Sequence, residues 1–93
     1  MEDSWCVYMV RCSDGSLYTG IAKDVRRRVA EHNGERPLAA RYTRARRPVT
    51  LVYRETLPTR SAAARRESVI KRLSRAAKQA LIIGAENEHE HRP

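Results

Sequence analysis

A short hydrophobic run near the N-terminus constrains the fold of this chain more than any other segment. Residues 5–11 read Trp-Cys-Val-Tyr-Met-Val-Arg and are rich in β-branched and aromatic side chains, a composition typical of a buried strand. The next segment, residues 13–16, reads Ser-Asp-Gly-Ser and predicts a turn. Residues 17–21 resume a strand pattern. Residues 5–21 therefore predict a β-hairpin.

A helix is expected after this hairpin. Asp24 is a favourable N-cap for it, and Asn33-Gly34 is a typical helix end. Between these points four residues recur at helical spacing: Val25, Arg28, Val29 and His32. Residues 35–48 then form a polar, arginine-rich connection. Residues 49–54 are rich in β-branched side chains and predict a third strand.

Two more helices are expected beyond the third strand. The first is capped by Thr59 or Ser61, since both residue types are favourable at an N-cap. The second is capped by Ser74 and ended by Gly84. The first of these helices presents one apolar stripe, which comprises Ala62, Ala63, Arg66, Val69, Ile70 and Leu73.

This order of elements predicts an α+β fold, a small three-stranded antiparallel sheet flanked by helices. A chain of 93 residues has the length of one domain with a modest core. We place that domain at residues 1–85. Residues 86–93 are charged and contain two histidines, and we expect them to form a disordered C-terminal tail.

The charge balance indicates a polyanionic partner. The chain has 19 Lys+Arg residues against 11 Asp+Glu, a formal net charge of +8, and 16 of the 19 basic residues are arginine. Because arginine binds phosphate through a planar, bidentate guanidinium, this excess favours a phosphodiester partner. A solubilising surface is the alternative interpretation, since net charge alone specifies no partner.

Cysteine content and hydropathy indicate the compartment. Cys6 and Cys12 are too few for a disulfide scaffold, and their even separation predicts core positions on one face of the sheet. No secretory signal precedes them, and no apolar run approaches the roughly 20 residues needed to span a bilayer. We therefore expect a reduced, cytoplasmic protein that has no membrane partner.

Two tripeptides carry a resemblance to a known family. Cys-Val-Tyr at residues 6–8 and Tyr-Thr-Gly at residues 18–20 resemble the paired signature of the GIY-YIG nuclease superfamily. Cysteine replaces the first glycine and threonine replaces the isoleucine, but both tyrosines are present. The resemblance extends over about residues 4–83 and implies the GIY-YIG endonuclease-like fold.

Further segments extend this resemblance. Residues 20–29 are similar to the family's strand-to-helix segment, which ends in an arginine followed by an aliphatic residue, as Arg28 is here. Glu67 matches the family's metal-binding glutamate. Three shorter motifs resemble the small stand-alone bacterial subgroup often called YhbQ-like: His32-Asn33, Tyr42-Thr43-Arg44 and Arg47-Pro48-Val49.

The resemblance implies metal-dependent cleavage of phosphodiester bonds. Glu67 would hold Mg²⁺ or Mn²⁺, since such an ion is suited by one carboxylate and several waters. Arg28 would clamp the phosphate, and Tyr8 or Tyr18 would orient and deprotonate the attacking water. His32 is an alternative base or phosphate contact. We expect Tyr8, Tyr18, Arg28 and Glu67 to line one shallow cleft on one face of the sheet.

Each of these residues also has a purely structural interpretation. The tyrosines could pack against the sheet as ordinary strand aromatics, and His32 could stabilise the end of a helix. Glu67 could pair with Arg66 or Lys71 on a helix surface, a contact worth roughly 0.2–0.5 kcal/mol.

The expected partner is nucleic acid, with DNA favoured over RNA in a role related to repair, and a partner protein would supply targeting. Four basic residues are expected to contact it: Lys23, Arg27, Arg41 and Arg44. The alternative function is a nucleic-acid-binding module with weak or no catalytic activity. It is favoured by residues 74–79, which offer no clear polar residue to complete the site after the last core helix. A protein-interaction domain that binds an acidic partner has no positive motif.

Overall fold

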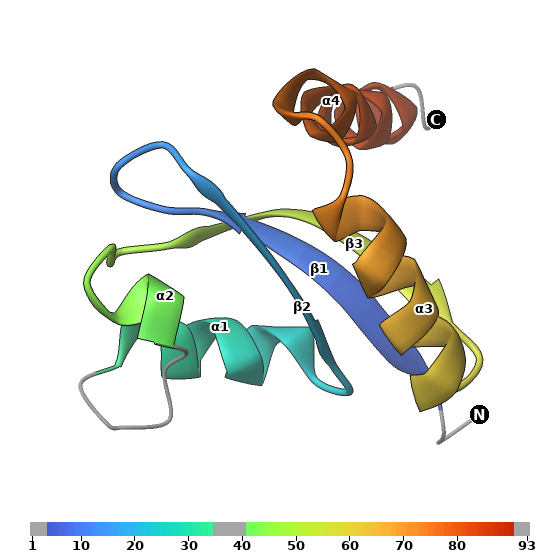
Figure 1. Cartoon of the computed structure of the whole chain (residues 1–93), viewed down its shortest axis with the longest axis horizontal. Helices are drawn as coiled ribbons and strands as arrows, with labels where there is room; N and C mark the ends of the chain where they lie inside the picture. Colours follow the sequence, from blue (N-terminus) through green and yellow to red (C-terminus); the bar gives the residue numbers. More distant parts are fainter. Residues whose placement is uncertain (1–3, 35–40, 91–93) are drawn as a thin grey trace.

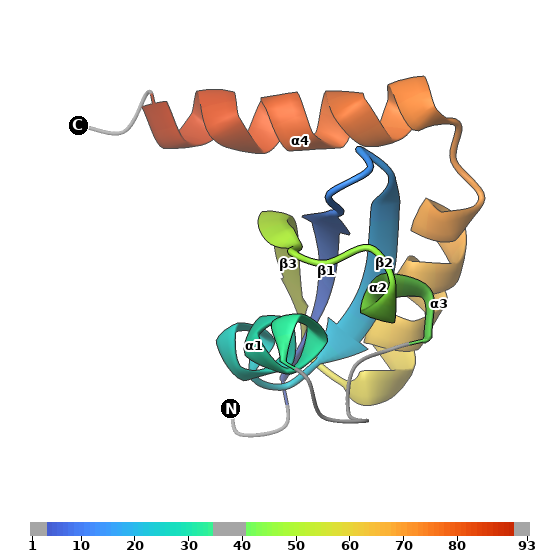
Figure 2. The same ribbon diagram turned by 90° about the vertical axis from the view of Figure 1, so that its left-hand side faces the viewer.

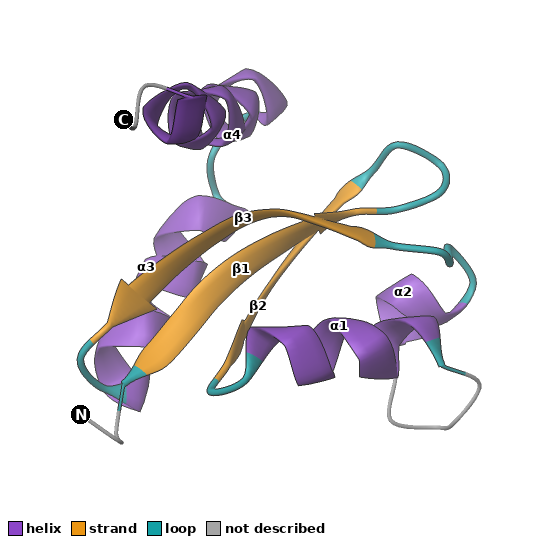
Figure 3. Cartoon of the chain, turned by 180° about the vertical axis from the view of Figure 1, so that it is seen from behind, coloured by secondary structure: helices purple, strands orange, loops and turns teal. Residues whose placement is uncertain are grey.

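The computed structural model describes residues 4–34 and 41–90 (Figure 1). In these ranges the order of elements is β1 (Trp5–Arg11), β2 (Leu17–Ala22), α1 (Val25–Asn33), α2 (Arg41–Arg44), β3 (Thr50–Leu57), α3 (Arg60–Lys71) and α4 (Arg75–Glu90). The strands form one antiparallel sheet in the order β2-β1-β3 (Figure 3). The predicted fold class and hairpin are therefore confirmed.

The central strand β1 is buried on both faces. Cys6, Tyr8 and Val10 belong to one hydrophobic cluster, whereas Val7 and Met9 belong to another. All five are at most 5% exposed. A strand that is covered on both faces needs apolar side chains at successive positions, which accounts for the unbroken hydrophobic run in the sequence.

Helices cover both faces of this sheet (Figure 2). Val25 of α1 packs in the cluster that contains Tyr8, while Ala63 and Ile70 of α3 pack in the cluster on the opposite face. Helix α4 lies across the end of the sheet near the β1–β2 turn, where Arg75 donates a hydrogen bond to the Gly15 carbonyl at 2.8 Å. The result is a sheet enclosed between α1 and the α3–α4 pair.

Local capping fixes where the helices begin. The Asp24 side chain accepts a hydrogen bond from the backbone N–H of Arg27 at 3.1 Å, which starts α1. Thr59, and not Ser61, caps α3 by accepting from the backbone N–H of Ala62 at 3.0 Å. Ser74 caps α4 in the same way, through the N–H of Ala77 at 3.1 Å. The three predicted helix starts are confirmed.

Several boundaries differ from the prediction. The third strand begins at residue 50 and continues to residue 57, and the short helix α2 lies within a segment predicted as a connection. Gly84 does not end α4, and residues 86–90, which we expected to be a disordered tail, are helical. A glycine in a helix interior costs about 1 kcal/mol, too little to interrupt a helix of 16 residues. Residues 91–93 lie outside the described ranges.

The apolar stripe predicted for α3 is narrower than expected. Ala63 and Ile70, two helical turns apart, are fully buried, but Val69 is 42% exposed. Val69 lies about 100° around the helix from Ile70 and so misses the sheet.

Two further expectations concern the positions of the cysteines and the hydropathy of the helices. Cys6 and Cys12 are free thiols buried in the same cluster, as predicted for core residues on one face. Across the described part of the chain, no helix combines the length and apolar character that crossing a bilayer requires.

Candidate active site at the edge of the sheet

Tyr8 extends from the central strand across the edge strand β2. It is paired with Gly20 in the β1–β2 register. A Cβ atom at Gly20 would lie 2.7 Å from Tyr8 Oη and 2.9 Å from Cζ, closer than real Cβ contacts. The glycine therefore leaves the space that the phenol ring occupies, and through this space the Tyr8 hydroxyl reaches His32 of α1.

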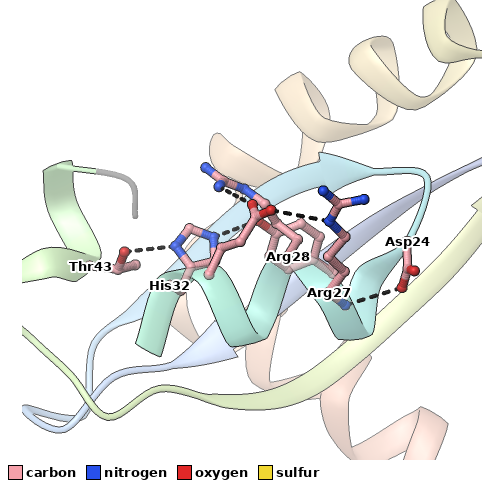
Figure 4. Close-up of polar contacts among 7 residues, drawn as sticks. Asp24, Arg27, Arg28, His32 and Thr43 are labelled. Carbon is pink, nitrogen blue, oxygen red and sulfur yellow. Dashed lines mark hydrogen bonds and ion pairs between the residues drawn. The ribbon is translucent and has the colours of Figure 1, made fainter. Parts of the chain in front are cut away.

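A chain of short hydrogen bonds continues from that hydroxyl (Figure 4). Tyr8 Oη lies 2.7 Å from His32 Nε2, and His32 Nδ1 lies 2.7 Å from Thr43 Oγ1 of α2. Tyr8 is 1% exposed, and His32 and Thr43 are fully buried. The three residues come from three different elements, and their hydrogen bonds join α1, α2 and the sheet.

Burial keeps His32 uncharged. Desolvation, reinforced by the positive charge of Arg28, lowers the pKa of His32 to about 4, while the negative charge of Glu31 opposes this shift. At neutral pH one imidazole nitrogen is therefore a hydrogen-bond donor and the other is an acceptor.

The charges of three expected site residues act on the Tyr8 hydroxyl. Burial and repulsion by the phenolate charge of Tyr18 raise the pKa of Tyr8 to about 12, and the charge of Glu67 adds to this rise. Arg28 opposes the rise through its charge and a hydrogen bond. The structure thus brings Tyr18, Arg28 and Glu67 into electrostatic range of one phenol, which His32 also contacts.

Arg28 already has a counter-ion in the free protein. Its Nη1 atom lies 2.8 Å from Glu31 Oε1, and Nε of Arg27 lies 3.5 Å from the other oxygen of the same carboxylate (Figure 4). The Arg28 side chain is 28% exposed, so it faces both the Tyr8 hydroxyl and solvent. A phosphate that binds Arg28 would compete with Glu31 for the guanidinium.

Glu67 reaches the site from the opposite layer. It lies on α3, whose core residues belong to the cluster on the far face of the sheet from Tyr8. Glu67 therefore comes from a different layer of the fold than Arg28 and His32, and the single cleft that all four residues were expected to line stays a prediction. Its carboxylate is 22% exposed, so it does not face bulk solvent, and its charge acts on Tyr8. Since α3 packs against β2, the edge strand, the two layers approach each other there.

The donor set limits which metal site is feasible. Within residues 4–34 and 41–90, no group of three or more His, Cys, Asp or Glu side chains could enclose an ion. A single half-buried carboxylate fits a hydrated ion such as Mg²⁺, which keeps several water ligands. Lys71 Nζ lies 3.2 Å from Glu67 Oε2, the structural pairing considered above, and would compete with that ion.

The four residues expected to contact nucleic acid are distributed around α1 and α2. Lys23 is exposed in the turn between β2 and α1, Arg27 is exposed on α1, and Arg44 is exposed on α2. Arg41 lies at the start of α2, and its side chain is outside the described part of the structure. Helices α1 and α2 contact each other, so the exposed cations lie on neighbouring elements.

Three motifs quoted from the sequence meet in space. The Asn33 side-chain amide donates to the Val49 carbonyl at 3.0 Å and accepts from the Val49 N–H at 2.6 Å, while Arg47 donates to the Gly34 carbonyl. Together with the contact between His32 and Thr43, these bonds hold the connection that carries α2 against the end of α1. The motifs therefore have a common structural purpose.

Three residues of the site have no role predicted from the sequence: Thr43, Glu31 and Gly20. For Glu31 a local signal exists, because its spacing of three from Arg28 predicts a helical ion pair. The contacts of Thr43 with His32 and of Gly20 with Tyr8 join separate elements and depend on how those elements pack.

A separate groove of 390 Å³ lies between β3 and α4. It contains none of the predicted site residues and is lined by Tyr53, Arg54, Glu55, Ala80, Leu81, Gly84 and Ala85.

Comparison with known proteins places this geometry in a family. The model of the GIY-YIG catalytic domain matches residues 4–80. A UPF0213 protein of Desulfotalea psychrophila is 53% identical over 83 residues, which cover 89% of this chain and 74% of that protein. A UPF0213 protein of Staphylococcus aureus is 56% identical over 80 residues, which cover 86% of this chain and 95% of that protein.

Two solved structures are also similar. The solution structure of a UPF0213 protein from Bacillus halodurans is 40% identical, with a TM-score of 0.54, and the match covers 85% of this chain and 82% of that chain. A protein from E. faecalis is 34% identical, with a TM-score of 0.59, over 100% and 99% of the two chains. With a family model that covers most of its length and relatives that are more than half identical to it over the aligned residues, this chain belongs to the GIY-YIG catalytic-domain family and groups with the UPF0213 proteins.

Proposed function

We propose that this protein is an endonuclease that hydrolyses phosphodiester bonds in nucleic acid, preferentially DNA, with Mg²⁺ or Mn²⁺ as cofactor. The observation that carries this proposal is the buried hydroxyl of Tyr8, which lies 2.7 Å from His32 Nε2 and on whose pKa the charges of Arg28 and Glu67 act. Membership of a nuclease-type superfamily supports it. A phosphate clamp, a proton acceptor and a metal-binding carboxylate around one point are what phosphodiester hydrolysis requires.

In this proposal Tyr8 orients the attacking water and accepts its proton. The pKa of about 12 means that Tyr8 is protonated at neutral pH, so its own proton must leave as it accepts another. His32 Nε2, at 2.7 Å, is placed to take it once a bound phosphate offsets the positive charge of Arg28, which helps to hold the pKa of His32 at about 4 in the free protein. Water oxygen then forms a bond to phosphorus while the bond to the leaving oxygen breaks, and Arg28 stabilises the charge on the phosphate. The leaving oxygen takes a proton from solvent water, and His32 returns its proton to solvent.

Glu67 is the residue that would hold the metal. When bound, the ion supplies positive charge that acidifies water and offsets the charge developing on the phosphate. The same positive charge would counteract the negative field that Glu67 itself exerts on Tyr8. Arg28 exchanges its contact with Glu31 for a contact with phosphate, for which the planar guanidinium is suited.

The surface around the site supports a polyanionic substrate. The exposed cations Lys23, Arg27 and Arg44 lie in the turn before α1, on α1 and on α2, and the chain carries a net charge of +8. DNA is the substrate we propose first, in a process related to repair, and a partner protein would direct the enzyme to its target. The two free thiols suit the reducing cytoplasm, where we propose that the protein acts.

The proposal is tested by incubating the protein with supercoiled, branched and single-stranded DNA, and with RNA, in the presence of Mg²⁺ or Mn²⁺. Nicks should accumulate and should be abolished by EDTA. Tyr8→Phe, Arg28→Ala and Glu67→Gln should each reduce the single-turnover rate by at least about 100-fold. Arg26→Ala, which removes an exposed neighbour of Arg28, is the matched control and should retain most activity.

The residue assignment is wrong if cleavage survives both Arg28→Ala and Glu67→Gln. It is also wrong if Arg26→Ala is as damaging as Arg28→Ala, because loss of positive charge would then explain both results.

A binding module with weak chemistry is the second candidate, and two observations favour it. In the free protein Lys71 neutralises the metal-binding carboxylate, and Gln79, a polar residue beyond α3, accepts a hydrogen bond from Arg11 at 3.3 Å instead of joining Tyr8. This candidate predicts tight, salt-sensitive binding of nucleic acid without nicks at any metal concentration.

A further inference from the structure

The hydrogen-bond chain at the site ends at a residue for which the proposed chemistry has no role. Thr43 of α2 is fully buried, and its Oγ1 atom lies 2.7 Å from His32 Nδ1. On the other side of the ring, His32 Nε2 lies 2.7 Å from Tyr8 Oη. Both nitrogens of one uncharged imidazole are thus engaged, and one of them must be the donor.

The chemical character of the two hydroxyls decides which nitrogen carries the proton. A phenol O–H is a stronger hydrogen-bond donor and a weaker acceptor than the hydroxyl of threonine, because the aromatic ring withdraws electron density from its oxygen. Tyr8 Oη therefore donates to His32 Nε2, and His32 Nδ1 carries the hydrogen, which it donates to Thr43 Oγ1.

We propose that Thr43 is a positioning residue that holds His32 as the Nδ1–H tautomer and so keeps the Nε2 lone pair directed at Tyr8. The catalytic part of this inference rests on the proposed function, because a relay from Tyr8 to His32 requires that lone pair. An uncoordinated neutral imidazole favours the opposite tautomer, with the proton on Nε2. Without the acceptor at Nδ1, His32 would adopt that tautomer and direct a donor, instead of a lone pair, at the Tyr8 hydroxyl.

The position of Thr43 links this tautomer to the surface that would bind nucleic acid. Thr43 lies between Tyr42, whose ring stacks on Tyr18 with centroids 5.8 Å apart, and the exposed Arg44. Tyr18 in turn contacts the His32 ring edge-on, at a centroid distance of 5.3 Å. Two adjacent residues of α2 therefore face in different directions: Arg44 is exposed to solvent, and Thr43 contacts the buried imidazole of His32.

The test measures the tautomer directly, by long-range ¹H–¹⁵N NMR of imidazole nitrogens in the full chain. His32→Gln identifies the His32 signals by their loss. In the wild type we expect a protonated Nδ1 and an unprotonated Nε2. Thr43→Ser, which keeps the hydroxyl, should preserve this pattern, and Thr43→Val, which keeps the shape, should shift the population toward protonated Nε2.

Single-turnover cleavage supplies the second readout. We expect Thr43→Val to lower the rate at saturating DNA at least about tenfold with little change in DNA affinity, and Thr43→Ser to restore the rate. The inference is overturned if wild-type His32 carries its proton on Nε2, or if Thr43→Val leaves the tautomer unchanged. A wild type with the expected tautomer that cleaves no nucleic acid overturns the proposed function and leaves the role of Thr43 in the tautomer standing.

Discussion

The phenol ring of Tyr8 lies directly over the backbone of Gly20 on the neighbouring strand, and a Cβ atom at that glycine would come within 2.7 Å of the Tyr8 hydroxyl oxygen. The two residues belong to the two halves of the sequence signature and are paired in the β1–β2 register. One tripeptide supplies the ring, and the other supplies the space for it. The two tripeptides of the signature are therefore joined by a direct contact between adjacent strands.

We expect Gly20→Ala to damage both stability and activity. The backbone of Gly20 is not in the left-handed region, so the cost is steric and arises because the Tyr8 ring is buried and cannot yield. Overpacking of this kind costs about 1–3 kcal/mol and would displace the hydroxyl from His32. Thermal unfolding should show a lower melting temperature, and cleavage assays should show loss of activity.

Gly84→Ala is the matched control for that substitution. An added Cβ at Gly84 meets nothing within 4 Å, and the residue lies inside α4. This variant should be more stable than the wild type by about 0.5–1 kcal/mol and fully active. Equal behaviour of the two alanine variants would contradict the steric role of Gly20.

Stability should decrease as the pH falls from 6.5 towards 4, because of His32. Burial, together with Arg28, lowers the pKa of His32 to about 4 in the folded protein, against 6.5 in the unfolded chain. The unfolded chain therefore takes up a proton in this interval that the folded protein does not. His32 does not lower the free energy of unfolding above pH 6.5. Its protonation in the unfolded chain lowers that free energy by roughly 3 kcal/mol by pH 4.

Urea denaturation at intervals between pH 7 and 5 measures this effect. Hydrogen bonds from Ser16 and Arg28 lower the pKa values of Asp14 and Glu31, respectively, in the folded protein. These two carboxylates therefore reduce the free energy of unfolding only below their unfolded pKa values of 3.8 and 4.5. The upper part of the interval therefore isolates the histidine. His32→Gln should flatten the dependence there, and an unchanged slope in that variant would refute the assignment.

Removing the charge of Glu31 should strengthen binding of nucleic acid. Glu31 holds Arg28 at 2.8 Å and Arg27 at 3.5 Å, so Glu31→Gln releases both guanidinium groups for phosphate. We expect affinity for a DNA duplex to rise by roughly two- to fivefold at low salt, as the loss of a partly exposed ion pair suggests. Fluorescence anisotropy over a range of salt concentrations measures the change.

Glu55→Gln provides a control of the same chemistry. Glu55 on β3 pairs with Arg66 at 2.9 Å, and both side chains are about one-third exposed. The substitution removes one negative charge and one arginine pair on the α3 face of the sheet, opposite the face that the Tyr8 ring occupies. An equal gain in affinity from the two variants would show that net charge, and not release of Arg28, is responsible.

Lys71→Met should strengthen metal binding at Glu67. The Lys71 ammonium lies 3.2 Å from Glu67 Oε2 and competes with a cation for that oxygen. Titration of Mn²⁺ followed by electron paramagnetic resonance should show a dissociation constant lowered by roughly two- to fivefold. Glu67→Gln should abolish this binding, and Lys78→Met, which removes a lysine charge on α4, should leave it unchanged. Binding that persists in Glu67→Gln would place the metal elsewhere.

Much of the fold follows from local signals. The hydrophobic run at residues 5–11 coincides with β1, and Asp24, Thr59 and Ser74 cap the helices that they were expected to cap. These features depend on side chains within a few residues of each other. The helix end predicted at Gly84 is wrong, because tertiary contacts of α4 outweigh the weak helix propensity of one glycine.

The sequence by itself determined the identity of the chemical groups: two signature tyrosines, an arginine and a histidine one turn apart on one helix, and a distant glutamate. Only the tertiary structure decided how they meet. It brought Glu67 from the opposite layer, gave Arg28 a counter-ion in Glu31 and placed Thr43 against His32. The reason is physical: periodicity and capping depend on neighbours within a turn or a strand, whereas contacts between distant residues depend on how helices pack around the sheet.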